Sequence, residues 1–493
     1  MNKKKNLLTA LILQIVTMVS GLVLPRLIIS TFGSEVNGLV SSITQFLSFI
    51  SLLEGGLGAV VLAELYKPIE DKDDRKINSI LTSCQNFFKH LTVIFIVYTV
   101  LLGVIYGFFL RDKFTFGFVC SLTFILSFTT LVQYLFSITY KLLLQAQQKM
   151  YIVNSVSTGT VMLNFIIAIV LVKVFPDIHA IKLGSAIAFL IQPLVFSHYC
   201  NKKYKEKLRK ENHDKYEIRN RWDGFAQNLA HFVNLNTDIV IITIFLTLSD
   251  VSVYSVYMLP ITALRSIIAS LTNSYQSALG KYYAQGDYGE LRMHFNRFDN
   301  ANIMITTAMF SACLVLINPF VSLYTAGISD ADYYKPLFAI IIVLANMIYC
   351  IREPYRFLIL AAGKFKETNK GAVLEAVINL VVSVALIWKM GLVGVAIGTL
   401  VAITYRFIYF MTYLKSNILM KQYQEYVFGT LKVLVFIAIN ITASFLCKIK
   451  INNYMEFAIF GVIIFAVEAA VSYLLFMKKY KIIKGKRRTG VRK

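Results

Sequence analysis

Charged side chains are scarce in this sequence. They make up 16% of its 493 residues, whereas about a quarter of the residues in soluble domains are charged. Apolar residues reach 57%, and the mean hydropathy is +0.63. This composition excludes an ordinary soluble domain and indicates that lipid surrounds most of the chain.

Acidic residues are the scarcer of the two charged classes. The chain has 27 Asp and Glu against 50 Lys and Arg, a formal net charge of +23. In a soluble protein this excess would suggest nucleic acid, but here the basic residues cluster between apolar segments, which is typical of membrane topology signals and of contact with anionic head groups. The motifs of nucleic-acid-binding proteins are absent, so we expect no such partner.

Motifs of metal, cofactor and catalytic sites are also missing. The six cysteines are scattered singly, without a CxxC or Cys/His cluster. Glycine-rich phosphate loops, HExxH and GxSxG are absent, so we expect no metal, no cofactor, no ATP site and no enzymatic activity. The first apolar run continues past Pro25 with no small-residue cleavage site, and we interpret it as a retained helix.

Long apolar runs are what the chain has in abundance. A spanning helix needs about 20 mostly apolar residues, and such runs predict helices because lipid offers no partners for backbone groups. We predict an all-α polytopic membrane protein with about fourteen transmembrane helices. Their ranges are 6–30, 36–63, 86–110, 115–139, 151–175, 180–200, 223–247, 250–277, 294–318, 334–361, 369–389, 391–414, 426–447 and 454–477.

The distribution of basic residues predicts the orientation. With the N-terminus inside, the inner segments hold about 35 of the 50 Lys and Arg residues and the outer loops about eight, as the positive-inside rule requires. We therefore expect a multi-pass protein of the bacterial cell membrane with both termini in the cytoplasm.

An internal repeat divides the chain. Residues 140–149 match residues 355–364, and 184–188 match 394–398, at similar offsets. Two copies of six helices each would keep the same orientation and form two lobes related by a pseudo-twofold axis along the membrane normal, with a cleft between them. The predicted parts are an N-terminal lobe (1–200), a basic linker (201–222), a C-terminal lobe (223–415), an extra helix pair (416–477) and a basic tail (478–493).

Charged side chains inside the spans each cost about 2.5–3.5 kcal/mol at the helix centre on insertion scales. They are tolerated beside a partner or a wet cavity, or near a span end from which they reach the interface. The basic ones are Arg26, Arg265, Arg352, Arg356 and Arg406, and the acidic ones are Glu54, Asp238, Glu353, Glu375 and Glu468.

Four arginines are candidate ligands of an anionic substrate. Arg26 follows a proline deep in the first helix, and Arg265 lies near the middle of its span. Arg352 and Arg356 are four residues apart and share a helix face. The arginine fork suits phosphate oxygens, so this pair could hold a diphosphate. The competing interpretation is an ion-paired kink around Pro354.

Two further positions are candidates for sugar contact or ion coupling. Asn234 and Asp238 share a face of the seventh helix and could hydrogen-bond sugar hydroxyls, while Asp238 could also pair with an arginine or bind a cation. A structural bond between helices is the alternative. Glu54 precedes Gly55-Gly56 in the second helix and is, with Asp238, a candidate for coupling to a H⁺ or Na⁺ gradient.

Four segments resemble bacterial polysaccharide flippases of the Wzx type. In the first segment Pro25, Gly33 and Gly38 match the family's pattern, and Asn37 stands where tyrosine is usual. The family belongs to the multidrug/oligosaccharidyl-lipid/polysaccharide superfamily, which is MATE-like. The segments are 24–39, 49–56, 236–241 and 391–398.

This resemblance implies a cationic central cavity and a transporter for an undecaprenyl-diphosphate-linked oligosaccharide. The substrate would pass from the inner to the outer leaflet for capsule or exopolysaccharide synthesis, with a polysaccharide polymerase and glycosyltransferases as partners. Three alternatives stay open: a multidrug or cation exporter, a lipid II flippase, and, in another class, a membrane-embedded polymerase or acyltransferase. The short outer loops argue against that last class.

Overall fold

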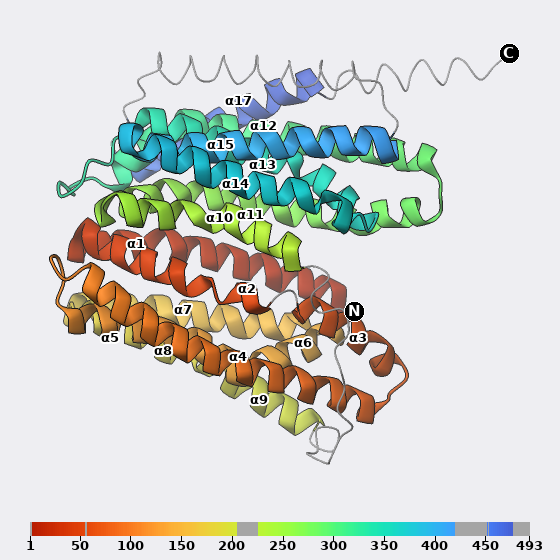
Figure 1. The fold of residues 1–493 in the computed structure, drawn as a ribbon, viewed down its shortest axis with the longest axis horizontal. Helices are drawn as coiled ribbons and strands as arrows, with labels where there is room; N and C mark the ends of the chain where they lie inside the picture. The colour runs from red at the N-terminus through yellow and green to blue at the C-terminus, as the bar shows by residue number, and fades with distance from the viewer. Residues whose placement is uncertain (1, 55–56, 205–224, 420–450, 452, 477–493) are drawn as a thin grey trace. The chain divides into compact units, whose positions relative to one another are not determined.

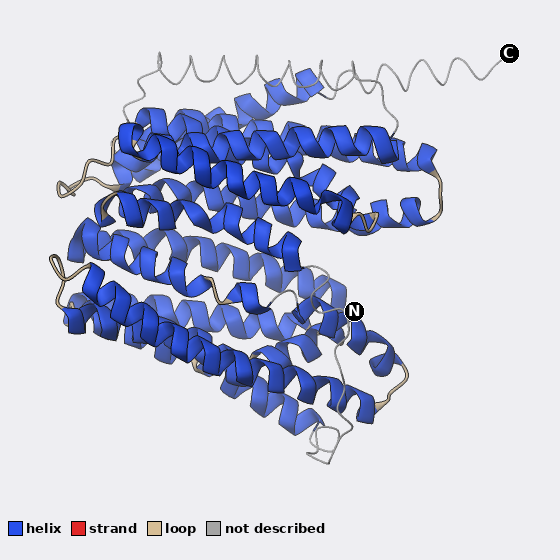
Figure 2. Cartoon of the chain, in the orientation of Figure 1, coloured by secondary structure: helices blue, strands red, loops and turns tan. Residues whose placement is uncertain are grey.

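The computed structural model describes residues 2–54, 57–204, 225–419, 451 and 453–476. Over these residues the chain is helical and has no strand (Figure 2), which confirms the predicted all-α class. The chain divides into two compact units, Met1–Phe232 and Val233–Lys493 (Figure 1). The boundary between them falls within one helix, α10.

The first unit is a bundle of long apolar helices. In it α1 packs along α7, α4 along α5, and α7 along α8. The helix α1 is interrupted at Gly33, whose φ of 84° separates two helical stretches. The helices are α1 (Asn2–Ser48), α2 (Ser51–Glu54), α3 (Leu57–Glu70), α4 (Asp74–Phe109), α5 (Phe116–Phe136), α6 (Ile138–Ala146), α7 (Met150–Val174), α8 (Ile178–Phe189) and α9 (Ile191–Tyr204).

The second unit is built around α13, which packs against α11, α12 and α15. The helix α14 lies along α15, and α12 also contacts α17. The helices are α10 (Phe225–Phe245), α11 (Leu248–Ala284), α12 (Tyr288–Tyr324), α13 (Pro336–Ala361), α14 (Phe365–Met390), α15 (Leu392–Leu414), the short π-helix η1 (Lys415–Leu419) and α17 (Tyr454–Phe476).

Eleven helical stretches among the described residues are long and apolar enough to cross a membrane, and Asn236–Phe245 is a shorter apolar helix. The chain is therefore a multi-pass membrane protein, since helices satisfy their own backbone groups in lipid. The predicted span at 426–447 lies outside the described residues, and a total of about fourteen spans agrees with this fold.

One turn occurs in both units with nearly the same geometry. Between α3 and α4, Lys72 has a φ of 57° and Asp73 accepts a hydrogen bond from the backbone of Lys76 at 3.0 Å. Between α11 and α12, at an offset of 214 residues, Gly286 has a φ of 70° and Asp287 caps the next helix in the same way. This turn therefore has the same backbone geometry in both units.

A second turn repeats within the segments whose sequences match. The helix α6 ends before Gln148, which has a φ of 58°, and α13 ends before Gly363, which has a φ of 68°. The backbone nitrogens of Lys149 and Lys364 both donate to the carbonyl five residues earlier, at 2.8 and 3.1 Å. This bond closes a helix through a left-handed residue, so the matched segments form the same helix end.

Two predicted spans contain a local break in the helix. The predicted span 36–63 is interrupted after Ser48, where the backbones of Phe49 and Ile50 donate to carbonyls only three residues back. The predicted span 180–200 divides at Leu190 into α8 and α9. Hydropathy alone cannot show such breaks, because the residues on either side are equally apolar.

Candidate functional site

The helix α13 carries a charged segment into the interior of the second unit. Arg352 and Glu353 are buried residues, only 2% and 7% exposed. Pro354 lacks the N–H that would bond the carbonyl of Cys350, and the Asn302 amide of α12 donates to that carbonyl at 2.9 Å instead. The helix thus passes through the proline with its freed carbonyl satisfied.

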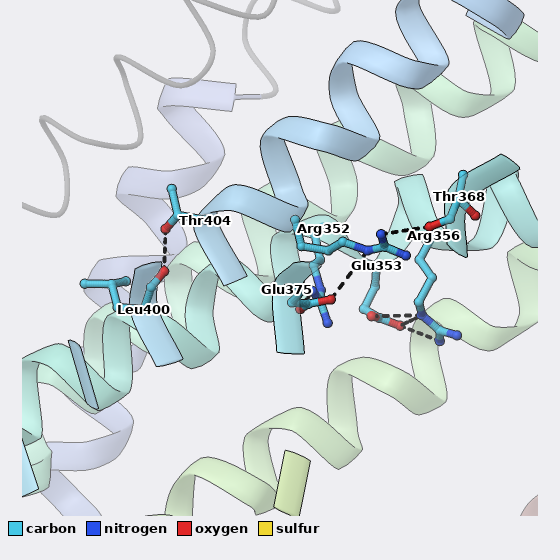
Figure 3. A network of polar contacts seen from close by, with 8 residues as sticks. Arg352, Glu353, Arg356, Thr368, Glu375, Leu400 and Thr404 are labelled. Atoms are coloured by element: carbon cyan, nitrogen blue, oxygen red, sulfur yellow. Dashed lines mark hydrogen bonds and ion pairs between the residues drawn. The ribbon is translucent and has the colours of Figure 1, made fainter. Parts of the chain in front are cut away.

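A buried carboxylate joins three helices at this level (Figure 3). Glu375 of α14 forms an ion pair with the guanidinium of Arg352, and its other oxygen lies 3.4 Å from Arg406 Nε of α15. Arg406 also donates to the Thr368 carbonyl at 3.0 Å. One carboxylate therefore faces two guanidinium groups, and all three side chains are at most 5% exposed.

Arg356 is held differently. Its Nε and Nη2 donate to both oxygens of Glu353, at distances of 2.7 to 3.1 Å (Figure 3). The side chain is 27% exposed, far more than that of Arg352. The structure therefore contains the ion pair around Pro354 that was the competing interpretation. Direct substrate contact by Arg352 and Arg356 stays a prediction.

Arg265 of α11 is half-buried and lies beside the same segment. Its Nη1 donates to Asn346 Oδ1 of α13 at 3.1 Å, and its guanidinium carbon lies 4.1 Å from the centre of the Tyr349 ring. Among the described residues it makes no ion pair with a carboxylate. Arg265 therefore differs from Arg352, Arg356 and Arg406, each of which lies beside a carboxylate: it is partly exposed and its direct partners are neutral.

Asp238 of α10 is the centre of an oxygen-rich cluster. It is 3% exposed, and it accepts hydrogen bonds from the hydroxyls of Tyr254 and Thr399, each at 2.9 Å. Asn379 also bonds to it, and Ser383 Oγ lies 3.1 Å from Asn379 Oδ1.

This cluster presents one carboxylate with hydroxyl and amide oxygens, the donor set that hard cations prefer. No group of three or more His, Cys, Asp or Glu residues suited to a metal occurs in the described part of the chain. The arrangement around Asp238 is therefore one buried carboxylate that accepts hydrogen bonds from neutral polar groups.

Two predicted site residues belong to the first unit. Arg26 lies half-buried in α1, next to the proline within that helix. Glu54 ends α2, and its carboxylate bonds to the Tyr134 hydroxyl of α5. The side chain of Asn234 lies outside what the structure describes. The structure thus brings together Arg265, the arginines of α13 and their partners.

Several residues near this site could not be identified as site residues from the sequence. Asn346 and Tyr349 are neutral, so the free-energy cost of a charge in a span does not mark them. Asp299 is charged and 7% exposed, and it accepts a hydrogen bond from Tyr355 at 2.8 Å. It lies near the start of a predicted span, where an acidic residue is expected to reach the interface.

Comparison by sequence yields no relative: no family model matches the chain, and no curated protein matches it. The fold, however, is shared with solved transporters. The lipid II flippase MurJ, in an inward closed conformation, has a TM-score of 0.65 at 14% identity, covering 96% of this chain and 100% of that one.

Two MATE transporters align less completely. An inward-facing multidrug resistance transporter of the MATE family, in the MOP superfamily, has a TM-score of 0.57 at 14% identity over 81% of this chain and 95% of its own. The Vibrio cholerae MATE transporter VcmN, as a point mutant, has a TM-score of 0.55 at 14% identity over 85% and 98%. These likenesses show a shared fold.

Proposed function

We propose that this protein is a transporter that flips an undecaprenyl-diphosphate-linked oligosaccharide from the cytoplasmic to the outer leaflet by alternating access. The fold supports a flippase or exporter, and one of the structures that share it is a lipid II flippase. The observation that carries the proposal is Arg265. It is a partly exposed guanidinium in a membrane-spanning helix, held by neutral groups.

A guanidinium held this way has donors to offer an anion. Arginine has five N–H groups, and the bond to Asn346 uses one of them. Its direct partners are neutral, so it can form an ion pair with an anion, which favours a diphosphate over a cationic drug. We assign Arg356 and Arg26 as further phosphate contacts and Asn234 as a sugar contact, as predicted from the sequence.

We assign Asp238 to energy coupling. Its carboxylate is buried among hydroxyls, so binding a proton or Na⁺ would neutralise it where water is scarce. The charge of Arg265 acts on Asp238, so an ion bound at Asp238 and an anion bound at Arg265 would influence each other. Glu54 is the second coupling candidate, and the proposal needs no catalytic step.

The remaining parts of the proposal concern the cell. We place the protein in the bacterial cell membrane with both termini in the cytoplasm, acting with glycosyltransferases that build the lipid-linked unit and a polymerase that consumes it. Its product would be a capsule or exopolysaccharide. A lipid II flippase is the second candidate, because it shares the diphosphate lipid with the first.

The test is transport in proteoliposomes of defined orientation. The substrates are an undecaprenyl-diphosphate oligosaccharide, lipid II and a cationic dye, each followed by a membrane-impermeant reagent. We expect Arg265→Ala to reduce glycolipid flipping at least tenfold, while Arg111→Ala, the same change in an exposed loop, leaves it unchanged. Full flipping by Arg265→Ala, or transport of the dye alone, would refute the proposal.

A further inference from the structure

Two guanidinium groups share one aromatic ring in the second unit. The guanidinium carbons of Arg265 and Arg352 lie 4.1 and 4.7 Å from the centre of the Tyr349 ring. Both distances are within the range of cation–π attraction. Asn346, Tyr349 and Arg352 follow at intervals of three along α13, so they occupy one side of that helix.

Each guanidinium is also fixed by a second contact. Arg265 donates to Asn346 Oδ1 at 3.1 Å, and the Asn346 amide in turn donates to the Ile342 carbonyl at 2.8 Å. That bond fixes which atom of the amide faces Arg265. Arg352 is held by its ion pair with Glu375.

Two like charges on one ring repel each other unless one is compensated. Glu375 forms an ion pair with Arg352, and it shares its single negative charge with Arg406, whose Nε lies 3.4 Å from its other oxygen. Arg265, by contrast, has neutral direct contacts at the ring, Asn346 and Tyr349. The order of contacts from Glu375 through Arg352 and Tyr349 to Arg265 therefore spans α14, α13 and α11.

We propose that Tyr349 and Asn346 are positioning residues that hold the Arg265 guanidinium ready for the diphosphate of the lipid-linked substrate. This inference rests on the proposed function, because it assigns Arg265 the same anion. A free arginine side chain has many rotamers to lose on binding. The ring and the amide oxygen restrict those rotamers in advance, so less freedom is lost when the anion arrives.

The experiment measures binding of undecaprenyl diphosphate to the purified full chain in nanodiscs at low salt. Tyr349→Leu removes the ring and is expected to raise the Kd about tenfold, in line with the strength of a desolvated cation–π contact. Tyr349→Phe keeps the ring and should stay within about twofold of the wild type. Asn346→Leu, which removes the amide oxygen at similar volume, should raise the Kd several-fold.

The readout specific to positioning is the double variant. In the Arg265→Ala background, Tyr349→Leu should cause no further loss of affinity, because there is no guanidinium left to position. A merely structural ring would weaken binding in both backgrounds or lower the thermal stability of both. If Tyr349→Leu does not fold, the affinity of Asn346→Leu is compared instead, with and without Arg265→Ala.

The outcomes separate the two ideas. Wild-type affinity in Arg265→Ala would overturn the proposed function and the positioning roles together. Weak binding by Arg265→Ala, with wild-type binding by folded Tyr349→Leu or Asn346→Leu, would overturn positioning alone. Equal losses with Tyr349→Phe and Tyr349→Leu would also overturn it, because the hydroxyl and not the ring would then be the cause.

Discussion

Gly398 of α15 lies directly against Ser383 of α14. A Cβ built at Gly398 would overlap the Ser383 hydroxyl and would lie 2.8 Å from its backbone nitrogen. Four residues earlier, a Cβ at Gly394 would lie 2.6 Å from the carbonyl carbon of Leu386. This is the close backbone approach that small residues spaced by four allow between membrane helices. It also sets the position of Thr399, which bonds to Asp238.

Gly398→Ala should therefore destabilise the second unit. The added methyl must push α14 and α15 apart, and overpacking of this kind costs about 1–3 kcal/mol. We expect a clear fall in the thermal unfolding temperature of the purified protein. Gly117→Ala in α5 is the matched control, because nothing lies within 4 Å of its Cβ. An equal unfolding temperature for both variants would contradict the close packing.

Glu375→Gln should be strongly destabilising. The change keeps the size of the side chain but leaves Arg352 and Arg406 buried without a counter-charge. Breaking a buried ion pair by removing one partner costs about 3–5 kcal/mol.

The control is Glu367→Gln, which removes an exposed carboxylate paired with Lys364 at 3.0 Å. Exposed pairs contribute at most about 1 kcal/mol, so its unfolding temperature should stay near that of the wild type. A wild-type unfolding temperature for Glu375→Gln would show that the two arginines do not depend on this carboxylate.

Asp238→Asn should abolish the dependence of transport on an ion gradient. The amide can still accept a hydrogen bond from Thr399 or Tyr254, but it can neither take up a proton at physiological pH nor attract a cation. Flipping in proteoliposomes is measured with and without imposed H⁺ and Na⁺ gradients. Asp177→Asn is the control, because Asn caps a helix as well as Asp does. Full gradient dependence in Asp238→Asn would remove this residue from coupling.

At the two repeated turns, introducing a glycine and removing a glycine should have opposite effects on stability. Lys72 and Gln148 adopt left-handed conformations that cost L-residues about 1–2 kcal/mol, while Gly286 and Gly363 hold the matching places. Lys72→Gly and Gln148→Gly should stabilise the protein by about 0.5–1 kcal/mol each, because they relieve this strain. Gly286→Ala and Gly363→Ala should destabilise it by a similar amount. Unfolding temperatures that change in the same direction in all four variants would contradict the repeat.

The loop before α13 offers a test by pH. Lys335 donates a hydrogen bond to the Asp332 carboxylate at 2.6 Å, which lowers the pKa of Asp332 below its ordinary value. A depressed pKa stabilises the folded state above the ordinary pKa, and the gain is lost as the pH falls through the lowered value. Asp332→Asn should therefore be slightly less stable than the wild type at pH 7.

The difference between the two proteins should disappear under acid. It should be small throughout, since both side chains are substantially exposed. Unfolding temperatures of wild type and Asp332→Asn, compared from neutral pH to below about pH 3, measure it. A difference that grows as the pH falls would have the wrong sign for this ion pair.

Much of the fold follows from the sequence, because apolar length and charge between spans are local properties. The match between residues 140–149 and 355–364 even locates a shared helix end. The breaks at Phe49 and Leu190 do not follow, since equally apolar residues surround them. The left-handed conformations of Lys72 and Gln148 could not be predicted from the sequence either, because glycine is the residue that usually indicates that conformation.

The sequence predicts which charged residues belong to the candidate site, but it does not predict which of them form ion pairs with each other. Charges in spans are costly wherever they occur, so Arg265, Arg352 and Glu375 stand out in the sequence. Which carboxylate meets which guanidinium depends on how α13, α14 and α15 rotate about their axes. Neutral partners such as Tyr349 become visible only when the helices are packed.

The hairpin of α11 and α12 provides a way to establish which side of the membrane each part faces. Exposed charged side chains lie on either side of the turn at Gly286, on α11 (Lys281) and at the start of α12 (Asp287 and Glu290). We therefore expect this turn to lie at a membrane surface, since charged residues are costly within the lipid. A peptide epitope inserted there would be reachable by antibody from one compartment only, and staining of intact against opened cells would reveal which.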